Sequence, residues 1–391
     1  MTLDLTALAG FLFGLALPVA WFAATKTSRA LVTLHCQTQE KIDNLQRDVS
    51  MRFDRLESGR GPVKGPGAGV SQPGGPTAGA SPQCSTGTAS ESQEGPPGTE
   101  NTSYWSEHNV TYHRRFTSRE ESIHAFHDRN SGYLHYERLM PVAGFDDQVV
   151  MDYGCGPGHD LVGLIEFSAP RRVIGMDISP VSLREAGERL KLHRRPVELI
   201  QVKEGDTRLP LEDESVDYVH SSGVLHHMTN MEPILGEFRR VMKPDAKCRI
   251  MVYNYDSIFL HLYIAYQRQI IQGIDTDLPV LEAFRRACDT TEQISRVPES
   301  RCYKPAEFID ILSKLGFDAR LVGCAISTSE LSMLNARFDA IVNDHLAWQH
   351  RDFLRNLRFD EYGLPCSNSH VAGIDAVYEV TKRRHQSSVG A

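Results

Sequence analysis

The chain has 391 residues and a formal net charge of −8, with 24% charged and 41% apolar residues. This balance excludes a wholly disordered chain, a multi-span membrane protein and a basic nucleic-acid coat. Since phosphate binding requires clustered lysine and arginine, we expect no nucleic-acid partner. The eight cysteines form no CxxC pair, which argues against a zinc knuckle or a disulfide scaffold and favours a reducing compartment.

Residues 5–24 contain no charged side chain. At about 1.5 Å per residue, such a run just spans a hydrocarbon core of about 30 Å. A signal peptide would have basic residues before the apolar run and a small-residue cleavage site after it. This chain has neither feature. The sequence therefore predicts a transmembrane anchor over residues 1–25. Because Lys26 and Arg29 follow the span, we expect a single-pass protein of the bacterial inner membrane with its catalytic part in the cytoplasm.

Two segments are expected between this anchor and the folded part of the chain. Residues 26–57 are polar with a thin apolar stripe at helical spacing, which fits a solvated stalk helix and a short coiled coil pairing two copies equally well. Residues 58–100 contain 11 of the 30 glycines and 7 of the 20 prolines and keep no apolar period. This composition predicts a flexible linker.

From residue 101 onward the pattern is typical of one globular domain. Residues 101–147 are expected to form an N-terminal lid segment, with a helix from Ser118 through Leu139. From residue 148 to 391, apolar runs alternate with helical periods, which predicts a mainly parallel sheet covered by helices on both faces. Strands are predicted over 149–153, 172–177, 198–203, 216–221, 247–254, 319–325 and 375–381, and helices over 180–192, capped by Ser179, over 232–242, opened by the capping box Thr229-x-x-Glu232, and over 305–315.

A glycine-rich stretch, Asp152-Tyr-Gly-Cys-Gly-Pro-Gly158, follows the first of these strands. Glycines allow the backbone to turn sharply and to approach a ligand, and ligands of open α/β sheets bind at the carboxyl ends of strands. The spacing differs from the GxGxxG of dinucleotide sites. The acid before the glycines suits a ligand with an ammonium or sulfonium group better than a pyrophosphate.

Two further acids follow the next two strands. Asp177 ends the second strand, where it could accept hydrogen bonds from a ribose diol, and Asp206 follows the third, where an adenine amino group could be met. Each acid alone would be interpreted as a cap or turn residue. Their joint spacing favours a nucleoside that carries a cationic amino-acid tail.

Residues 148–254 resemble the class I S-adenosylmethionine-dependent methyltransferases, in particular the type 11 branch that contains the quinone-biosynthesis enzymes. The glycine stretch resembles the family's first motif and Asp177-Ile-Ser its ribose-binding acid; Ser222-Gly-Val-Leu-His-His227 and 235–244 resemble its later motifs, although Asp245-Ala246 replaces the usual glycine pair. The resemblance implies a Rossmann-like seven-stranded sheet and S-adenosylmethionine as cofactor. The cofactor-binding residues that we expect are Asp152, Gly154, Cys155, Gly156, Gly158, His159, Asp177, Ile178, Asp206, Thr207 and Ser222.

Methyl transfer needs no metal, and orientation of the reactants supplies much of its acceleration. A base helps when the acceptor is a hydroxyl or a carbon acid, and either His226 or His227, after the fourth strand, could be that base or could pack structurally. Tyr253, Asn254 and Arg129 are the expected substrate-binding residues; a surface salt bridge is the alternative for Arg129.

The insertions over 256–300 and 327–372 are longer than the minimal fold requires, and we expect them to be helical lids that select the acceptor. The sequence thus predicts a membrane-anchored methyltransferase acting on a small molecule, a glycan or a lipid precursor. The alternatives are a non-catalytic membrane scaffold that displays a cofactor-binding domain, and an NAD-dependent oxidoreductase.

Overall fold

A computed structural model describes residues 100–111, 113–288 and 297–383. The predicted anchor and stalk, and the linker up to residue 99, lie outside these residues. Within the described ranges no helix combines the length and the apolar character that crossing a bilayer requires.

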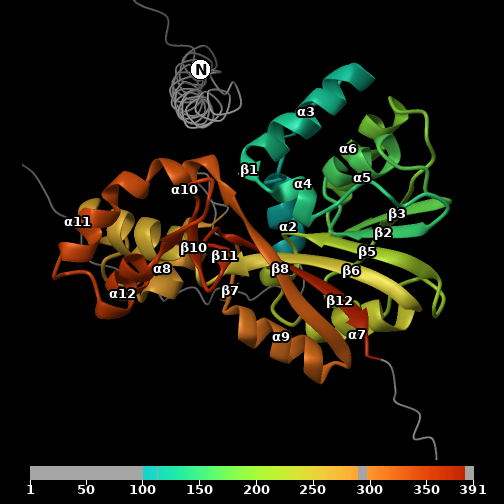
Figure 1. Cartoon of the computed structure of the whole chain (residues 1–391). Coiled ribbons are helices and arrows are strands. Elements are labelled where there is room, and N and C mark those ends of the chain that lie inside the picture. The colour runs from blue at the N-terminus through green and yellow to red at the C-terminus, as the bar shows by residue number, and fades with distance from the viewer. Residues whose placement is uncertain (1–99, 112, 289–296, 384–391) are drawn as a thin grey trace, which may run out of the picture. The chain divides into compact units, whose positions relative to one another are not determined.

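The described residues form a nine-stranded sheet whose seven main strands lie in the order β4–β3–β2–β5–β6–β12–β8 (Figure 1). The five strands from β4 to β6 are parallel, whereas β12 runs antiparallel to both of its neighbours. The sequence predicted all seven, and the α/β fold is confirmed. Their bounds are β2 Val149–Tyr153, β3 Arg172–Asp177, β4 Glu198–Gln201, β5 Val216–Ser222, β6 Met242–Asn254, β8 Phe317–Ser327 and β12 Asp375–Lys382, with β1 (Tyr133–Leu134) and β7 (Cys302–Tyr303) added beside β8 and β6.

Helices cover both faces of this sheet because side chains of the central strands alternate between the faces. In β2, Met151 belongs to an apolar cluster with side chains of α7 and α9, whereas Val150 packs with side chains of α5 and α6. Figure 1 shows the two layers: α3 (Arg119–Ser131), α5 (His159–Glu166) and α6 (Pro180–Lys191) on one face, and α7 (Glu232–Val241) and α9 (Pro305–Lys314) on the other.

Two local predictions were wrong. The helix predicted from Ser118 through Leu139 is broken: α3 ends at Ser131, and β1 follows, pairing with β8, before α4 (Tyr136–Leu139). Pairing of Tyr133 with Ser327 pulls the chain out of the helical path. The predicted capping box of α7 does not form either, because Met231 is the N-cap and Asn230, one residue from Thr229, accepts the backbone N–H of Glu232 at 3.2 Å.

The two insertions pack into one subdomain instead of forming separate covers. Leu262 of the first shares an apolar cluster with Leu354 of the second, and Nδ1 of His261 lies 2.8 Å from Nδ1 of His350. The elements gather beside the ends of β6 and β8 (Figure 1). They are the π-helix η2 (Phe259–Ile271), α8 (Val280–Ala287), α10 (Thr328–Ser332), η3 (Leu334–Ala336), α11 (Arg337–Val342), α12 (Trp348–Asn356) and the small sheet of β9 (Arg358–Phe359), β10 (Pro365–Ser367) and β11 (His370–Val371).

Candidate functional site

The glycine loop between β2 and α5 has a backbone that side chains would obstruct. Gly154, Gly156 and Gly158 all have positive φ, at 78°, 52° and 80°. A Cβ added to Gly154 would lie 2.1 Å from a methyl carbon of Val224, whereas one added to Gly156 would meet nothing within 4 Å. Gly154 therefore permits close packing, while Gly156 presents backbone to open space. Gly158 is the N-cap of α5.

Asp177, at the end of β3, holds this loop in place. One carboxylate oxygen accepts the backbone N–H of Gly156 at 2.8 Å, and the other accepts that of Ser179 at 2.8 Å. Burial raises the pKa of Asp177, and these two backbone donors oppose the rise. The residue expected to contact a ribose also shapes the loop beside it.

A cavity of about 530 Å³ runs along the carboxyl ends of the parallel strands from β2 to β5. The N-terminal segment contributes to its wall through Asn101, Trp105 and Val110. Gly158, at the start of α5, does not line it. The predicted site residues that the fold brings together in its wall are Arg129, Asp152, Gly154, Cys155, Gly156, His159, Asp177, Ile178, Asp206, Thr207, Ser222 and His227.

Asp152 presents a buried carboxylate to this cavity. The residue is 2% exposed, and Oδ2 has no hydrogen-bond partner within the described part of the chain. Burial raises the pKa of Asp152, which the positive charge of His220 only partly opposes. A buried acceptor without a donor is costly, so this oxygen is suited to a ligand that brings a donor or a positive charge.

His159, the first residue of α5, is a neutral part of the wall. Its Nε2 donates to the backbone carbonyl of Phe126 at 3.3 Å, and its ring stacks on that of Phe126. Burial lowers the pKa of His159 to about 3.

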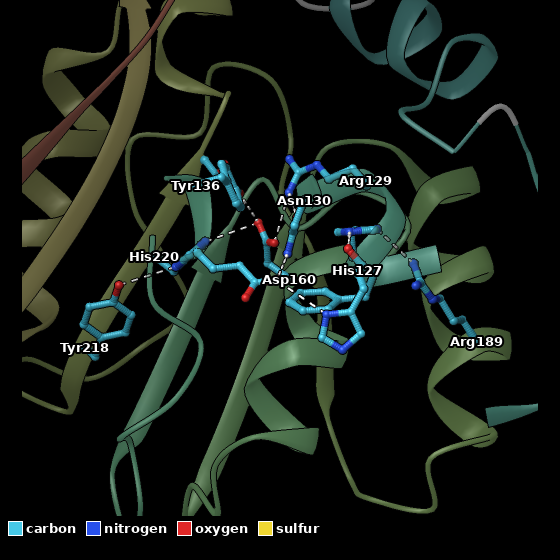
Figure 2. A network of polar contacts seen from close by, with 12 residues as sticks. His127, Arg129, Asn130, Tyr136, Asp160, Arg189, Tyr218 and His220 are labelled. Atoms are coloured by element: carbon cyan, nitrogen blue, oxygen red, sulfur yellow. Dashed lines mark hydrogen bonds and ion pairs between the residues drawn. The ribbon is translucent and has the colours of Figure 1, made fainter. Parts of the chain in front are cut away.

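A buried polar network that the sequence did not reveal lies next to the cavity (Figure 2). Its centre is Asp160, which accepts from Arg129 at 3.2 Å, from the hydroxyl of Tyr136 at 2.8 Å and from Nε2 of His220 at 3.3 Å. Burial opposes ionisation, but Arg129 and His220 hold the pKa of Asp160 well below its usual range. Burial also opposes a charge on His220, yet Asp160 raises the pKa of that imidazole.

Tyr136 carries this network to the cavity wall. Because the hydroxyl of Tyr136 already donates its hydrogen bond to Asp160, its oxygen accepts a hydrogen bond from the hydroxyl of Ser222, 2.7 Å away. The sequence held two weak signals of the network, a histidine inside the apolar strand 216–222 and an aspartate on the apolar helix 159–166.

Helix α2 (Glu100–Glu107) contributes Asn101 and Trp105 to the cavity wall. The amide of Asn101 donates to Glu204 at 2.6 Å, and the indole ring of Trp105 lies 4.9 Å from the ring of His227. The other carboxylate oxygen of Glu204 is buried without a partner among the residues the structure places. The helix therefore adds an aromatic wall through Trp105, and Glu204, which follows β4, adds an unsatisfied acceptor.

The two candidate catalytic histidines have different environments. Nδ1 of His227 lies 2.8 Å from the carbonyl oxygen of Glu299 and must carry the proton, so the lone pair of the neutral ring is on Nε2. His226 is 0% exposed and does not line the cavity, its ring lies 3.8 Å from that of Tyr253, and neither of its nitrogens finds a partner in the described ranges. Burial lowers the pKa of His226 well below its usual value.

Besides Gly158, the structure corrects the placement of three predicted residues and of both insertions. His226 and Tyr253 pack against each other behind the cavity wall, with their ring planes tilted by 32°. The amide of Asn254 donates to the backbone carbonyls of Asp256 and Gly373, and its oxygen accepts from the backbone N–H of Asp256. None of the described residues in 256–300 or 327–372 lines this cavity, because the insertions leave the sheet beyond β6 and β8, away from β2 and β3. Among the described residues, no three histidine, cysteine, aspartate or glutamate side chains lie close enough together to hold a metal ion.

Residues 145–307 match a family model described as a methyltransferase domain. Demethylmenaquinone methyltransferase of Lactobacillus johnsonii is 33% identical over 118 residues, which cover 30% of this chain and 47% of the relative. A protein described as an uncharacterized 37.1 kDa protein in transposon TN4556 of Streptomyces fradiae is 34% identical over 131 residues, or 32% of this chain and 37% of the relative.

Among solved structures, the YcgJ protein of Bacillus subtilis aligns with a TM-score of 0.40 and 16% identity over 61% of this chain and 93% of its own. The chain spans 37%, 38% and 60% of the length of three curated relatives that it matches.

Proposed function

Residues 145–307 belong to the class I S-adenosylmethionine-dependent methyltransferases, and we propose that this chain transfers a methyl group from that cofactor to an acceptor by in-line displacement. The observation that carries the proposal is the cavity wall: three acids at or just beyond the carboxyl ends of three neighbouring parallel strands, Asp152, Asp177 and Asp206, face one cavity beside the glycine loop.

The residues present fit this cofactor. The unpartnered oxygen of Asp152 suits the ammonium of a methionine tail, Asp177 a ribose diol and Asp206 an adenine amino group. Arg129, which lines the cavity, suits the carboxylate of the tail, and its bond to Asp160 orients it. When bound, S-adenosylmethionine would supply an electrophilic methyl group, which the lone pair of the acceptor would take while the electron pair of the carbon–sulfur bond stayed on sulfur.

His227 is the residue that we assign as the base. The carbonyl of Glu299 holds the proton on Nδ1, which places the lone pair of the neutral ring on Nε2, the nitrogen that we assign to take a proton from the acceptor. The ring lines the cavity next to Trp105. His226 is not assigned this role, because it is buried behind the wall.

Calorimetry of the full chain with S-adenosylmethionine tests cofactor binding. Asp206→Ala should weaken binding by at least tenfold, equivalent to about 1.4 kcal/mol, because Asp206 is exposed in the cavity wall. Asp310→Ala, on the exposed side of α9, is the matched control. Asp177→Ala is a poorer probe, since Asp177 accepts the backbone N–H groups of both Gly156 and Ser179, whereas Asp206 accepts that of Lys203. Absence of binding by a folded chain would overturn the proposal, and displacement by NAD would favour the oxidoreductase reading.

Incubation of cell extract with the chain and methyl-labelled S-adenosylmethionine tests turnover. Mass spectrometry should find a labelled product that is lost in His227→Gln. Cofactor binding without any labelled product would favour the non-catalytic scaffold.

We also propose that residues 5–24 anchor the chain in a membrane, with the catalytic domain on the cytoplasmic side and residues 26–57 between them as a solvated stalk helix or a short coiled coil. This proposal rests on sequence alone, namely the charge-free run and the cations that follow it. In fractionated cells the full chain should sediment with membranes, and the change Leu12→Arg with Leu15→Arg should release it. Lys26→Arg is the control, and equal sedimentation of all three chains would contradict the anchor.

A further inference from the structure

A second cavity, of about 610 Å³, lies on the other side of the loop that follows His227. Its wall comes from the start of α7, from α8, from the segment 299–303 and from α9. The first insertion, which does not reach the cofactor cavity, therefore contributes much of this second one. Nothing in the proposed cofactor site uses it.

The two cavities are neighbours. Met228, Thr229 and Asn230 line both of them, so one loop separates them. The segment 299–303 is attached to the same place: the carbonyl of Glu299 accepts from His227, and the backbone N–H of Arg301 donates to the carbonyl of His226 at 3.0 Å. A molecule in the second cavity would therefore have its near end close to His227, the residue assigned as the base in the first cavity.

The wall of the second cavity combines apolar surface with an excess of negative charge. Leu281, Phe284 and Ile311 supply apolar area. Arg285 pairs with Glu282 at 2.8 Å and Arg301 with Glu299 at 3.2 Å, so these four charges offset one another. Two more carboxylates, Glu232 and Glu307, line the wall and form no ion pair with any described residue. Within a concave wall, such an excess attracts cations and repels anions.

Ser300 gives an independent sign that the wall awaits a ligand. This lining residue is 3% exposed, and its hydroxyl oxygen has no hydrogen-bond partner in the part of the chain that the structure describes. Buried hydroxyls are nearly always satisfied, so a polar ligand group is the natural partner.

We infer that the second cavity binds the methyl acceptor, and that this acceptor has an apolar body and a basic nitrogen. The inference rests on the proposed methyltransferase function and adds the substrate class. The protonated nitrogen lies toward Glu232 and Glu307, the apolar body lies against Phe284 and its neighbours, and the reacting atom points past Met228 toward His227. Acceptors with phosphate or pyrophosphate groups, such as lipid-linked glycans, are disfavoured by the same charges.

The test compares two probes of equal length, n-octylammonium and octanoate, by calorimetry on the full chain at pH 7. Octylammonium should bind at least about tenfold more tightly than octanoate. The double variant Glu232→Gln with Glu307→Gln should weaken octylammonium binding by about tenfold and leave octanoate no weaker. Asp339→Asn, which removes an exposed carboxylate of α11 that does not line the cavity, should change neither probe.

Affinity for S-adenosylmethionine separates this inference from the proposed function. It should be the same in the parent and the double variant, which also verifies that the variant is folded. Equal binding of the two probes, or octylammonium binding that the double variant does not change, would overturn the acceptor site even if the cofactor binds. Loss of cofactor binding by the parent chain would overturn the proposed function, whatever the probes do.

Discussion

The phenol hydroxyl of Tyr136 donates a hydrogen bond to the carboxylate of Asp160 at 2.8 Å, and its oxygen lies 2.7 Å from the hydroxyl oxygen of Ser222. Tyr136 begins α4 in the N-terminal segment, Asp160 lies in the first turn of α5, and Ser222 ends β5. The side chain of Tyr136 thus links the N-terminal segment to both α5 and the end of β5. The link explains why residues before the methyltransferase-like segment belong to the site.

Removing this hydroxyl should weaken both folding and the site. Tyr136→Phe leaves Asp160 with two donors and Ser222 without its acceptor, and we expect a loss of about 2 kcal/mol in the free energy of unfolding. Cofactor affinity should fall several-fold, because Ser222 lines the cavity. Urea denaturation and calorimetry measure the two effects. Tyr263→Phe in η2 is the control, and an equal effect of both changes would contradict the role of Tyr136.

The contact between Gly154 and Val224 predicts a substitution and its rescue. Gly154→Ala places a Cβ 2.1 Å from Val224 at a φ of 78°, so it should cost about 3 kcal/mol and abolish cofactor binding. Val224→Ala in the same chain should restore part of the stability, since it removes the methyl carbons that clash.

Gly156→Ala separates packing from backbone strain. It has positive φ but no neighbour within 4 Å, so it should cost about 1 kcal/mol. Thermal unfolding compares the parent chain with Gly154→Ala, with Gly154→Ala combined with Val224→Ala, and with Gly156→Ala. If Val224→Ala gave Gly154→Ala no recovery, the clash would not be the cause of the loss.

Buried His226 predicts how stability depends on pH. Burial holds its folded pKa well below the usual value, so below pH about 6.5 the unfolded chain binds a proton that the folded chain does not. Stability must therefore fall as the pH falls, by about 1.4 kcal/mol per pH unit for this group.

Between pH 7.5 and pH 5, His226→Gln should lose about 2 kcal/mol less than the parent chain. The readout is the difference between the two denaturation curves at each pH, which cancels any constant packing cost. Parallel pH dependence of the two chains would show that His226 is not buried as a neutral ring.

The two neighbouring histidines should differ in activity. His227→Gln removes the proposed base and should lower kcat about 100-fold, while its affinity for S-adenosylmethionine stays within a few-fold. His226→Gln should keep kcat within a few-fold at pH 7.5, because its ring does not line the cavity. Labelled methyl transfer to extract acceptors measures both. A larger loss in His226→Gln would reverse the assignment.

The sequence predicted the strands, the glycine loop and the acids that follow the strands because these signals are local. Apolar runs identify strands, and a residue next to a strand end must lie at that edge of the sheet, so Asp152 and Asp177 could be placed without a structure. The helix predicted through Leu139 failed because pairing of Tyr133 with distant Ser327 outweighed the local helical pattern.

Only the tertiary structure decided which side chains meet across long stretches of chain. His226 and His227 are adjacent in sequence, yet packing against Tyr253 buries one ring and the carbonyl of Glu299 orients the other toward the cavity. No spacing in the sequence links Arg129, Asp160 and His220, since their contacts depend on how α3, α5 and β5 are packed. Local composition determined the sheet and its cofactor loop, whereas the acceptor side depends on contacts that exist only after the insertions have folded onto each other.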